Sequence, residues 1–299
     1  MSKTSTKNVV RTLLRHEFKH WMKFDKVARR GDDAEGVHQL RVGSRRLGAE
    51  LKIFTPVLKP KSRLKLKKEL RWIGKILGRQ RDLDVLHTLF VDLLGNEPIS
   101  TKVPVLSQLT KRRNAEQRSV AQALKSRRYR KFVHSLSGSL RQARMHSVAA
   151  QPAHDVFTPG LRRTLTSLFS TVDSVGPSPS DEQLHRIRKI VKRSRYGADV
   201  AARFLGTEAE AIVERLAQAQ EVLGDFHDRV VATTYLKQQS SNDTADDESF
   251  ENANAIAFLD RKLKESMDEL RTKWREPIEQ VRTLSTQLWN DVTSHQKKS

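Results

Sequence analysis

The 299-residue chain contains no cysteine, and only 6% of its residues are aromatic. Without thiols it has neither disulfides nor thiolate metal sites, which fits a reducing compartment. No apolar run is long enough to span a membrane, and the N-terminus lacks the apolar segment of a signal peptide, so we expect a cytoplasmic protein. Alternation of apolar and polar residues at the period of a β-strand is also missing. These absences favour an all-α fold.

The chain has a large excess of positive charge. Lys and Arg number 56 against 35 Asp and Glu, which gives a net charge of +21. Charged residues make up 30% of the chain and hydrophobic residues 37%, a balance that suits helices with narrow apolar stripes and long charged faces. The charge predicts a polyanionic partner, which is a nucleic acid, an anionic membrane or a phosphate polymer.

One stretch, VHQLRVGSRRLGAELKIF at residues 37–54, has a counterpart in LHRIRKIVKRSRYGADVA at residues 184–201. Both predict a helix, because apolar and charged residues separate at the 3.6-residue period. Like charges at this spacing repel. On one helix they would indicate only a solvated face, but two matching stripes favour a polyanion lying along them. The stripes hold His38, Arg41, Arg45 and Lys52 in the first helix, and His185, Arg188 and Lys192 in the second.

A second motif follows each stripe, LGRQRD at residues 77–82 and LGDFHD at residues 223–228. The same order and nearly the same separation indicate an internal duplication of about half the chain. Together, H-x-x-R-x-x-x-[RK]-R and L-G-x-x-x-D resemble the CHAD family, the conserved histidine α-helical domain, over nearly the whole chain. The resemblance implies an all-helical, pseudo-symmetric fold around a basic central cavity that binds inorganic polyphosphate, with no established catalytic role.

We therefore expect two helical bundles related by a pseudo-twofold axis around a basic central groove. Residues 1–150 would form the first repeat and residues 151–299 the second. Ser180 or Asp181 is the expected N-cap of the His185 helix. The other predicted helices span residues 9–30, 37–55, 64–77, 82–94, 104–146, 160–172, 208–223, 228–238 and 255–292, with a connector at 151–159, a mobile loop at 240–254 and a kink at Pro277.

Arginine and lysine are the residues best suited to bind a phosphate chain, since Arg donates bidentate hydrogen bonds and Lys supplies a point charge. We expect Arg41, Arg45, Arg188 and Lys192 to line the groove, with the two histidines supporting them. The full set of predicted polyphosphate-binding residues is His38, Arg41, Arg45, Arg46, Lys52, Lys68, Arg71, Lys75, His185, Arg188, Lys189, Lys192, Arg193 and Arg195.

Catalysis is not expected. Asp82, Asp84 and Asp228 are best interpreted as carboxylates that cap a helix start or hold a nearby arginine. The His-Asp dipeptide of metal-dependent phosphohydrolases occurs at residues 227–228, but the position matching His227 in the first repeat is Arg81, which is no metal ligand. We therefore predict a protein that is not an enzyme and that has no metal or cofactor.

The predicted function is binding of inorganic polyphosphate, in the cytoplasm and at polyphosphate granules. Some CHAD proteins carry a CYTH-type triphosphatase domain, whose E-x-E-x-K motif does not occur here, so the resemblance implies a stand-alone binding domain. The main alternative is nucleic-acid binding, which charge alone permits. Few aromatics and no helix-turn-helix, zinc-finger or RNA-recognition pattern favour nucleic acid only as a weaker, non-specific competitor. An adaptor for phosphate-rich bodies or anionic membranes is a third alternative.

Overall fold

The computed structural model of the protein describes residues 4–30, 34–95, 104–141, 143–240 and 247–296. All regular secondary structure in these ranges is helical, so the predicted all-α fold is confirmed. None of the described helices is both long and apolar enough to cross a membrane. The helices are α1 (Thr6–Arg30), α2 (Ala34–Ile53), α3 (Pro60–Leu94), α4 (Pro104–Lys125), α5 (Arg127–Arg141), the 3-10 helix η1 (Ser147–Ala150), α6 (Ala153–Asp173), α7 (Asp181–Leu205), α8 (Thr207–Ser240), α9 (Asp247–Lys273) and α10 (Arg275–Gln296).

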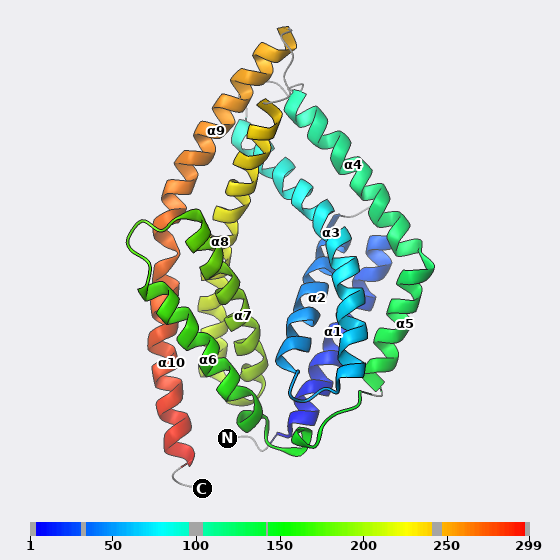
Figure 1. Ribbon diagram of the computed structural model, residues 1–299, viewed down its shortest axis with the longest axis vertical. Helices are drawn as coiled ribbons and strands as arrows, with labels where there is room; N and C mark the ends of the chain where they lie inside the picture. Colours follow the sequence, from blue (N-terminus) through cyan, green and yellow to red (C-terminus); the bar gives the residue numbers. More distant parts are fainter. Residues whose placement is uncertain (1–3, 31–33, 96–103, 142, 241–246, 297–299) are drawn as a thin grey trace.

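The helices form two lobes that follow the chain order. α1, α2, α4, α5 and most of α3 lie on one side and α6 to α10 on the other, and the far end of α3 reaches across to α8 and α9 (Figure 1). α2 and α7 contact each other between the lobes, and α4 and α9 meet the far ends of α3 and α8. The predicted Ser180 cap of α7 is confirmed, because Ser180 and Gln183 form a capping box in which each side chain bonds the other residue's backbone N–H.

The predicted break in the middle of each half is wrong. α3 runs unbroken for 35 residues and α8 for 34, so both L-G-x-x-x-D motifs lie inside a helix and Asp82 caps no helix start. A glycine inside a helix costs only about 1 kcal/mol relative to alanine. Burial of Leu77, Leu86 and Phe90 on either side of Gly78 outweighs that cost.

Two further boundaries differ from the prediction, each for a local reason. The helix predicted at 104–146 breaks at Ser126, whose hydroxyl accepts a hydrogen bond from the Tyr129 backbone and so caps α5. The stretch predicted at 255–292 is interrupted at Trp274, between α9 and α10, so the break lies three residues before Pro277 and the proline falls in the first turn of α10. Proline is tolerated in a first turn, where the backbone N–H has no helical partner.

The predicted connector and loop are also shorter than expected. α6 already begins at Ala153 and contains Pro159, within the predicted connector at 151–159, because Ala153, Phe157 and Leu161 are buried along one face. α9 begins at Asp247, so the loop predicted at 240–254 is helical from that residue on. Residues 241–246 of that prediction lie outside the described residues.

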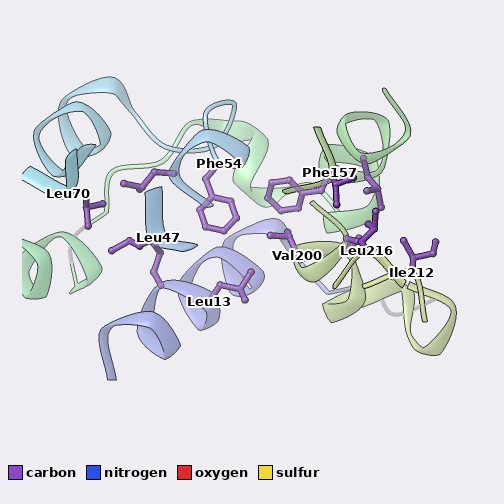
Figure 2. Packing of buried hydrophobic residues seen from close by; sticks show 14 of the residues in the cluster. Leu13, Leu47, Phe54, Leu70, Phe157, Val200, Ile212 and Leu216 are labelled. Carbon is purple, nitrogen blue, oxygen red and sulfur yellow. The ribbon is translucent and has the colours of Figure 1, made fainter. Parts of the chain in front are cut away.

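A continuous apolar core joins the two lobes at one end. Leu13, Leu47 and Leu70 fill the first lobe, and Ile212 and Leu216 the second (Figure 2). The lobes meet where the ring of Phe54 packs 5.7 Å from that of Phe157, which in turn lies 6.3 Å from Phe204. Each such fully buried side chain contributes about 1.5–3 kcal/mol.

A second apolar cluster joins the lobes at the other end. It combines the C-terminal parts of α3 and α8 with the N-terminal parts of α4 and α9. Phe90 of α3 and Tyr235 of α8 lie at its centre, with their rings 6.0 Å apart. The lobes are therefore tied at two places. Charged residues of α2, α3, α7 and α8 come together between the lobes.

A buried polar network fixes α5 on α1. Trp21 donates its indole N–H to the Tyr129 hydroxyl at 2.9 Å, and Tyr129 donates to Asp25 at 2.6 Å. Asp25 also accepts from Arg29. Every polar group in this chain of contacts has a partner, as burial requires.

The substitution Tyr129→Phe tests this network. We expect it to lower the free energy of unfolding by about 1–3 kcal/mol, because the Trp21 N–H loses its acceptor in a buried site. Urea denaturation followed by circular dichroism measures the loss. Tyr196→Phe is the matched control, since Tyr196 is partly exposed and its change should stay within about 0.5 kcal/mol. Equal losses in the two variants would contradict the role of the network.

Candidate functional site

α2 and α7 bring their charged faces together between the lobes. Leu40 and Leu47 of α2 and Ile187 and Val191 of α7 are buried in the core. The charged residues occupy the remaining helical phase, so the two basic stripes border the same space. The cations that meet there are Arg41 and Arg45 from α2 and Arg188 and Lys192 from α7.

These four cations line a cavity of about 260 Å³, here named the inner cavity. α3 and α8 complete its wall with Asp82, His227 and Asp228. Four cationic groups therefore surround two carboxylates. The remaining lining is apolar and comes from Val85, Leu86 and Val231.

A larger cleft of about 1090 Å³, named the outer cleft, lies between α2, α3, α6 and α7. Arg45 and Lys192 line both spaces, so the two spaces are neighbours at these side chains. Among the described residues no Asp, Glu or His lines the outer cleft. Its cationic lining consists of Arg45, Lys52, Lys67, Arg71, Lys75, Arg163, Lys189, Lys192 and Arg193.

The L-G-x-x-x-D motif holds an arginine of the first motif in place. Gly78 and Asp82 lie one turn apart on the same face of α3. Arg41 donates from Nη2 to Asp82 Oδ1 at 2.9 Å, and a Cβ at Gly78 would lie 3.9 Å from Arg41 Nε. In the second half the Asp228 carboxylate favours the charged form of Arg188, against the burial that lowers the pKa of Arg188. The predicted role of Asp82 in holding an arginine is confirmed.

A family model of the CHAD domain matches residues 12–237. The chain belongs to the CHAD domain family. Two curated relatives, uncharacterized proteins from Mycobacterium tuberculosis strains CDC 1551 / Oshkosh and H37Rv, are each 28% identical over 231 residues. The match covers 74% of this chain and 44% of each relative, so the chain spans less than half the length of these relatives.

Solved structures share the fold of this CHAD domain. The CHAD domain from the plant Ricinus communis superposes with a TM-score of 0.72 at 24% identity, covering 93% of this chain and 92% of that structure. PptA from Streptomyces chartreusis also gives a TM-score of 0.72, at 18% identity, covering 92% of this chain and 99% of that one. At these identities the likeness concerns the fold.

Most of the predicted binding residues line the cavities of this CHAD domain. Arg41 and Arg188 line the inner cavity, and Arg45 and Lys192 line both spaces. Five more line only the outer cleft: Lys52, Arg71, Lys75, Lys189 and Arg193. Neither space is lined by His38, Arg46, Lys68, His185 or Arg195.

The prediction missed two cations of the outer cleft, Lys67 and Arg163. Lys67 precedes Arg71 and Lys75 at intervals of four residues, a spacing that places all three on one face of a helix. Lys68 shares a face with Arg71 and Lys75 equally well, so only the packing of α3 places Lys67 in the cleft lining and not the predicted Lys68. Arg163 had no signal, because no motif indicated that α6 forms part of the cleft wall.

Arg46 turns away from both cavities and joins α2 to α1 and α7. Its guanidinium lies 2.6 Å from Asp199 and 3.4 Å from Glu17. Burial and the neighbouring Glu17 carboxylate raise the pKa of Glu50 to about 8, so Glu50 is protonated at neutral pH. Arg46 therefore has carboxylate partners within the protein.

Among the cations that line the inner cavity, Lys192 has the pKa that is shifted most strongly. Burial, together with the charges of Arg188, Arg45 and Arg41, lowers the pKa of Lys192 to about 7. Asp228 opposes the shift only in part. Near neutral pH the Lys192 amine is therefore only partly protonated, and an anion placed beside it would favour its charged form.

The two motif histidines, His38 and His185, and the cavity-lining His227 all have lowered pKa values. Burial and the nearby Arg81 lower the pKa of His38, and burial and Lys189 lower that of His185. Burial and Arg188 lower the pKa of His227 to about 4. The rings of His185 and His227 lie 5.0 Å apart. Among the described residues, no three His, Asp or Glu side chains come together to hold a metal ion.

The protonation state of Lys192 is open to a direct test. Competitive labelling with acetic anhydride reports the neutral amine, and we expect half-maximal labelling of Lys192 near pH 7. The variant Arg188→Gln should move this midpoint upward, because the largest neighbouring charge is removed. Peptide mass spectrometry measures both. A midpoint near the ordinary lysine value of about 10.4 in the unmodified protein would contradict the burial and crowding inferred here.

Proposed function

We propose that this CHAD domain binds linear inorganic polyphosphate along the outer cleft. The observation that carries the proposal is the lining of that cleft, where nine Lys and Arg side chains meet no carboxylate among the described residues. These cations come from α2 and α3 on one side and α6 and α7 on the other. A phosphate polymer offers one negative group after another, which suits cations spread along a cleft.

We infer that the basic cleft arose with an internal duplication. In each half a histidine-bearing helix is followed by a helix of 35 or 34 residues that carries L-G-x-x-x-D. Arg41 and Arg188 line one cavity from opposite lobes, each near the aspartate of its own motif. A pseudo-twofold axis between α2 and α7 would relate the pair Arg41 and Asp82 to the pair Arg188 and Asp228.

Binding without catalysis is the activity we propose. The outer cleft is lined by no carboxylate and no histidine among the described residues, and these are the groups that would activate water against a phosphoanhydride. Of the inner carboxylates, Asp82 accepts a hydrogen bond from Arg41. A binder of this kind would associate with polyphosphate granules in the cytoplasm.

Nucleic acid is the second candidate ligand, since the same cations attract any phosphate backbone. Proteins that bind single-stranded nucleic acid usually also present aromatic rings on which successive bases stack. The aromatic residues that line the outer cleft are Phe157, which is buried in the core, and Tyr196. The cleft therefore favours a polymer without bases.

The double variant Arg45→Ala with Lys192→Ala tests the cleft. It removes the two cations shared by both spaces. We expect about tenfold or greater weakening of polyphosphate binding, since hydrogen bonds to charged groups contribute about 1.5–3 kcal/mol each. Isothermal titration calorimetry measures the affinity, and circular dichroism checks that helicity is retained.

The matched control is Lys111→Ala with Arg118→Ala. It also removes one Lys and one Arg, both exposed on α4 and outside both cavities. Its affinity should stay near that of the unmodified protein. If the control loses as much affinity as the cleft variant, diffuse surface charge binds the polymer and the cleft does not.

A competition experiment separates the two candidate ligands. Fluorescent long-chain polyphosphate bound to the protein is challenged with unlabelled polyphosphate, duplex DNA or single-stranded DNA at equal phosphate concentration, in about 0.15 M salt. We expect polyphosphate to displace the probe at a concentration about tenfold lower than either DNA, a difference of about 1.4 kcal/mol. Equal displacement by DNA would favour the nucleic-acid alternative.

A further inference from the structure

α1 carries a row of cations on its outer face, named here the α1 stripe. Its members are separated by three or four residues, so at 100° per residue they fall within about 80° of one another. The row extends for about 22 Å at 1.5 Å per residue. All five side chains are exposed, and none lines the inner cavity or the outer cleft. They are Arg15, Lys19, Lys23, Lys26 and Arg30.

The acidic residues of α1 do not offset this charge. The helix contains two, Glu17 and Asp25, and both are buried on the opposite side. Glu17 contacts Arg46, and Asp25 contacts Arg29 and Tyr129. Within the described part of the chain, no member of the α1 stripe forms an ion pair. The stripe thus presents unneutralised positive charge to solvent.

α9 shows how a solvated charged helix of the same protein differs. Its exposed cations pair with acids three or four residues away on the same helix. Such pairs offset the repulsion that the α1 stripe retains. The matching helix of the second half, α6, carries only two cations, Arg162 and Arg163, so the stripe is not a repeated feature.

We propose that the α1 stripe is a second binding surface for polyphosphate, so that one molecule holds two segments of polymer at once. This inference rests on the proposed function of the outer cleft. A polymer held in the cleft raises the local concentration of its own free segments and of neighbouring chains near the stripe. Binding at both surfaces therefore joins chains into a network.

The surroundings of the stripe favour a polyanion in solution over a membrane. A helix that binds membranes turns large apolar side chains toward the lipid. The apolar residues of α1, such as Leu13 and Trp21, are instead buried in the core. The exposed large apolar residues among the described residues, Leu64 and Val91, both lie on α3.

The test uses a stripe variant with Arg15, Lys19, Lys23 and Lys26 each changed to Gln. The matched control changes Arg261, Lys262, Lys264 and Lys273 of α9 to Gln, which removes the same residue types and the same charge. Glutamine preserves helix propensity. Each protein is titrated with tripolyphosphate, which is short enough to occupy the cleft alone, and with long-chain polyphosphate. Calorimetry measures affinity and light scattering measures cross-linked assemblies.

We expect the stripe variant to bind tripolyphosphate like the unmodified protein. It should bind long-chain polyphosphate at least about tenfold more weakly, because the gain from two linked sites is lost. It should also form no light-scattering assemblies, whereas the α9 control should retain both properties. Equal behaviour of the stripe variant and the α9 control with the long polymer would overturn the proposal.

Two other outcomes identify a different occupant and also overturn the proposal. In one, the stripe variant keeps its long-chain binding but loses binding to vesicles of phosphatidylglycerol. In the other, it loses binding only to duplex DNA. Failure of the cleft itself is distinguishable, because the variant Arg45→Ala with Lys192→Ala would then bind tripolyphosphate as well as the unmodified protein does.

Discussion

Repulsion among the cations between α2 and α7 is the constraint on which the rest of the structure depends. Arg41, Arg45, Arg188 and Lys192 surround a space of about 260 Å³. Like charges repel more strongly there than in bulk water, because fewer water molecules screen them. The protein relieves part of the repulsion at Lys192, whose pKa falls to about 7. The carboxylates of α3 and α8 relieve another part.

Apolar packing on both sides of the site keeps these surfaces together. One cluster joins the lobes through Phe54 and Phe157, and the other through Phe90 and Tyr235. The lobes cannot separate without exposing this apolar surface to water, which costs a free energy of about 25 cal/mol per Å². Hydrophobic burial at the two ends thus offsets the electrostatic repulsion among the central cations. An anionic ligand bound between these cations would make their electrostatic free energy favourable.

The placement of carboxylates concentrates the net charge of +21 on particular surfaces of the protein. Glu17 and Asp199 lie against Arg46, and Asp25 lies against Arg29, all away from the outer cleft. The α9 acids pair with cations of their own helix. Among the described residues, no carboxylate lines the outer cleft and no cation of the α1 stripe forms an ion pair. The two halves differ in this respect, since α6 has no stripe like that of α1.

The sequence was enough to predict the all-α fold, the family and the four central cations, because the 3.6-residue period and the motif spacing can be read directly along the chain. The continuity of α3 could not be predicted from the sequence, because burial of residues on either side of Gly78 outweighs the low helix propensity of that glycine. One residue step turns a helix by about 100°. Neighbouring residues therefore point in different directions: Arg45 lines the cleft, whereas Arg46 contacts Asp199. In the same way Lys67 lines the cleft and Lys68 does not. Only the packing of α2 on α7, with α6 completing the cleft wall, decided which cations remain available to an anion.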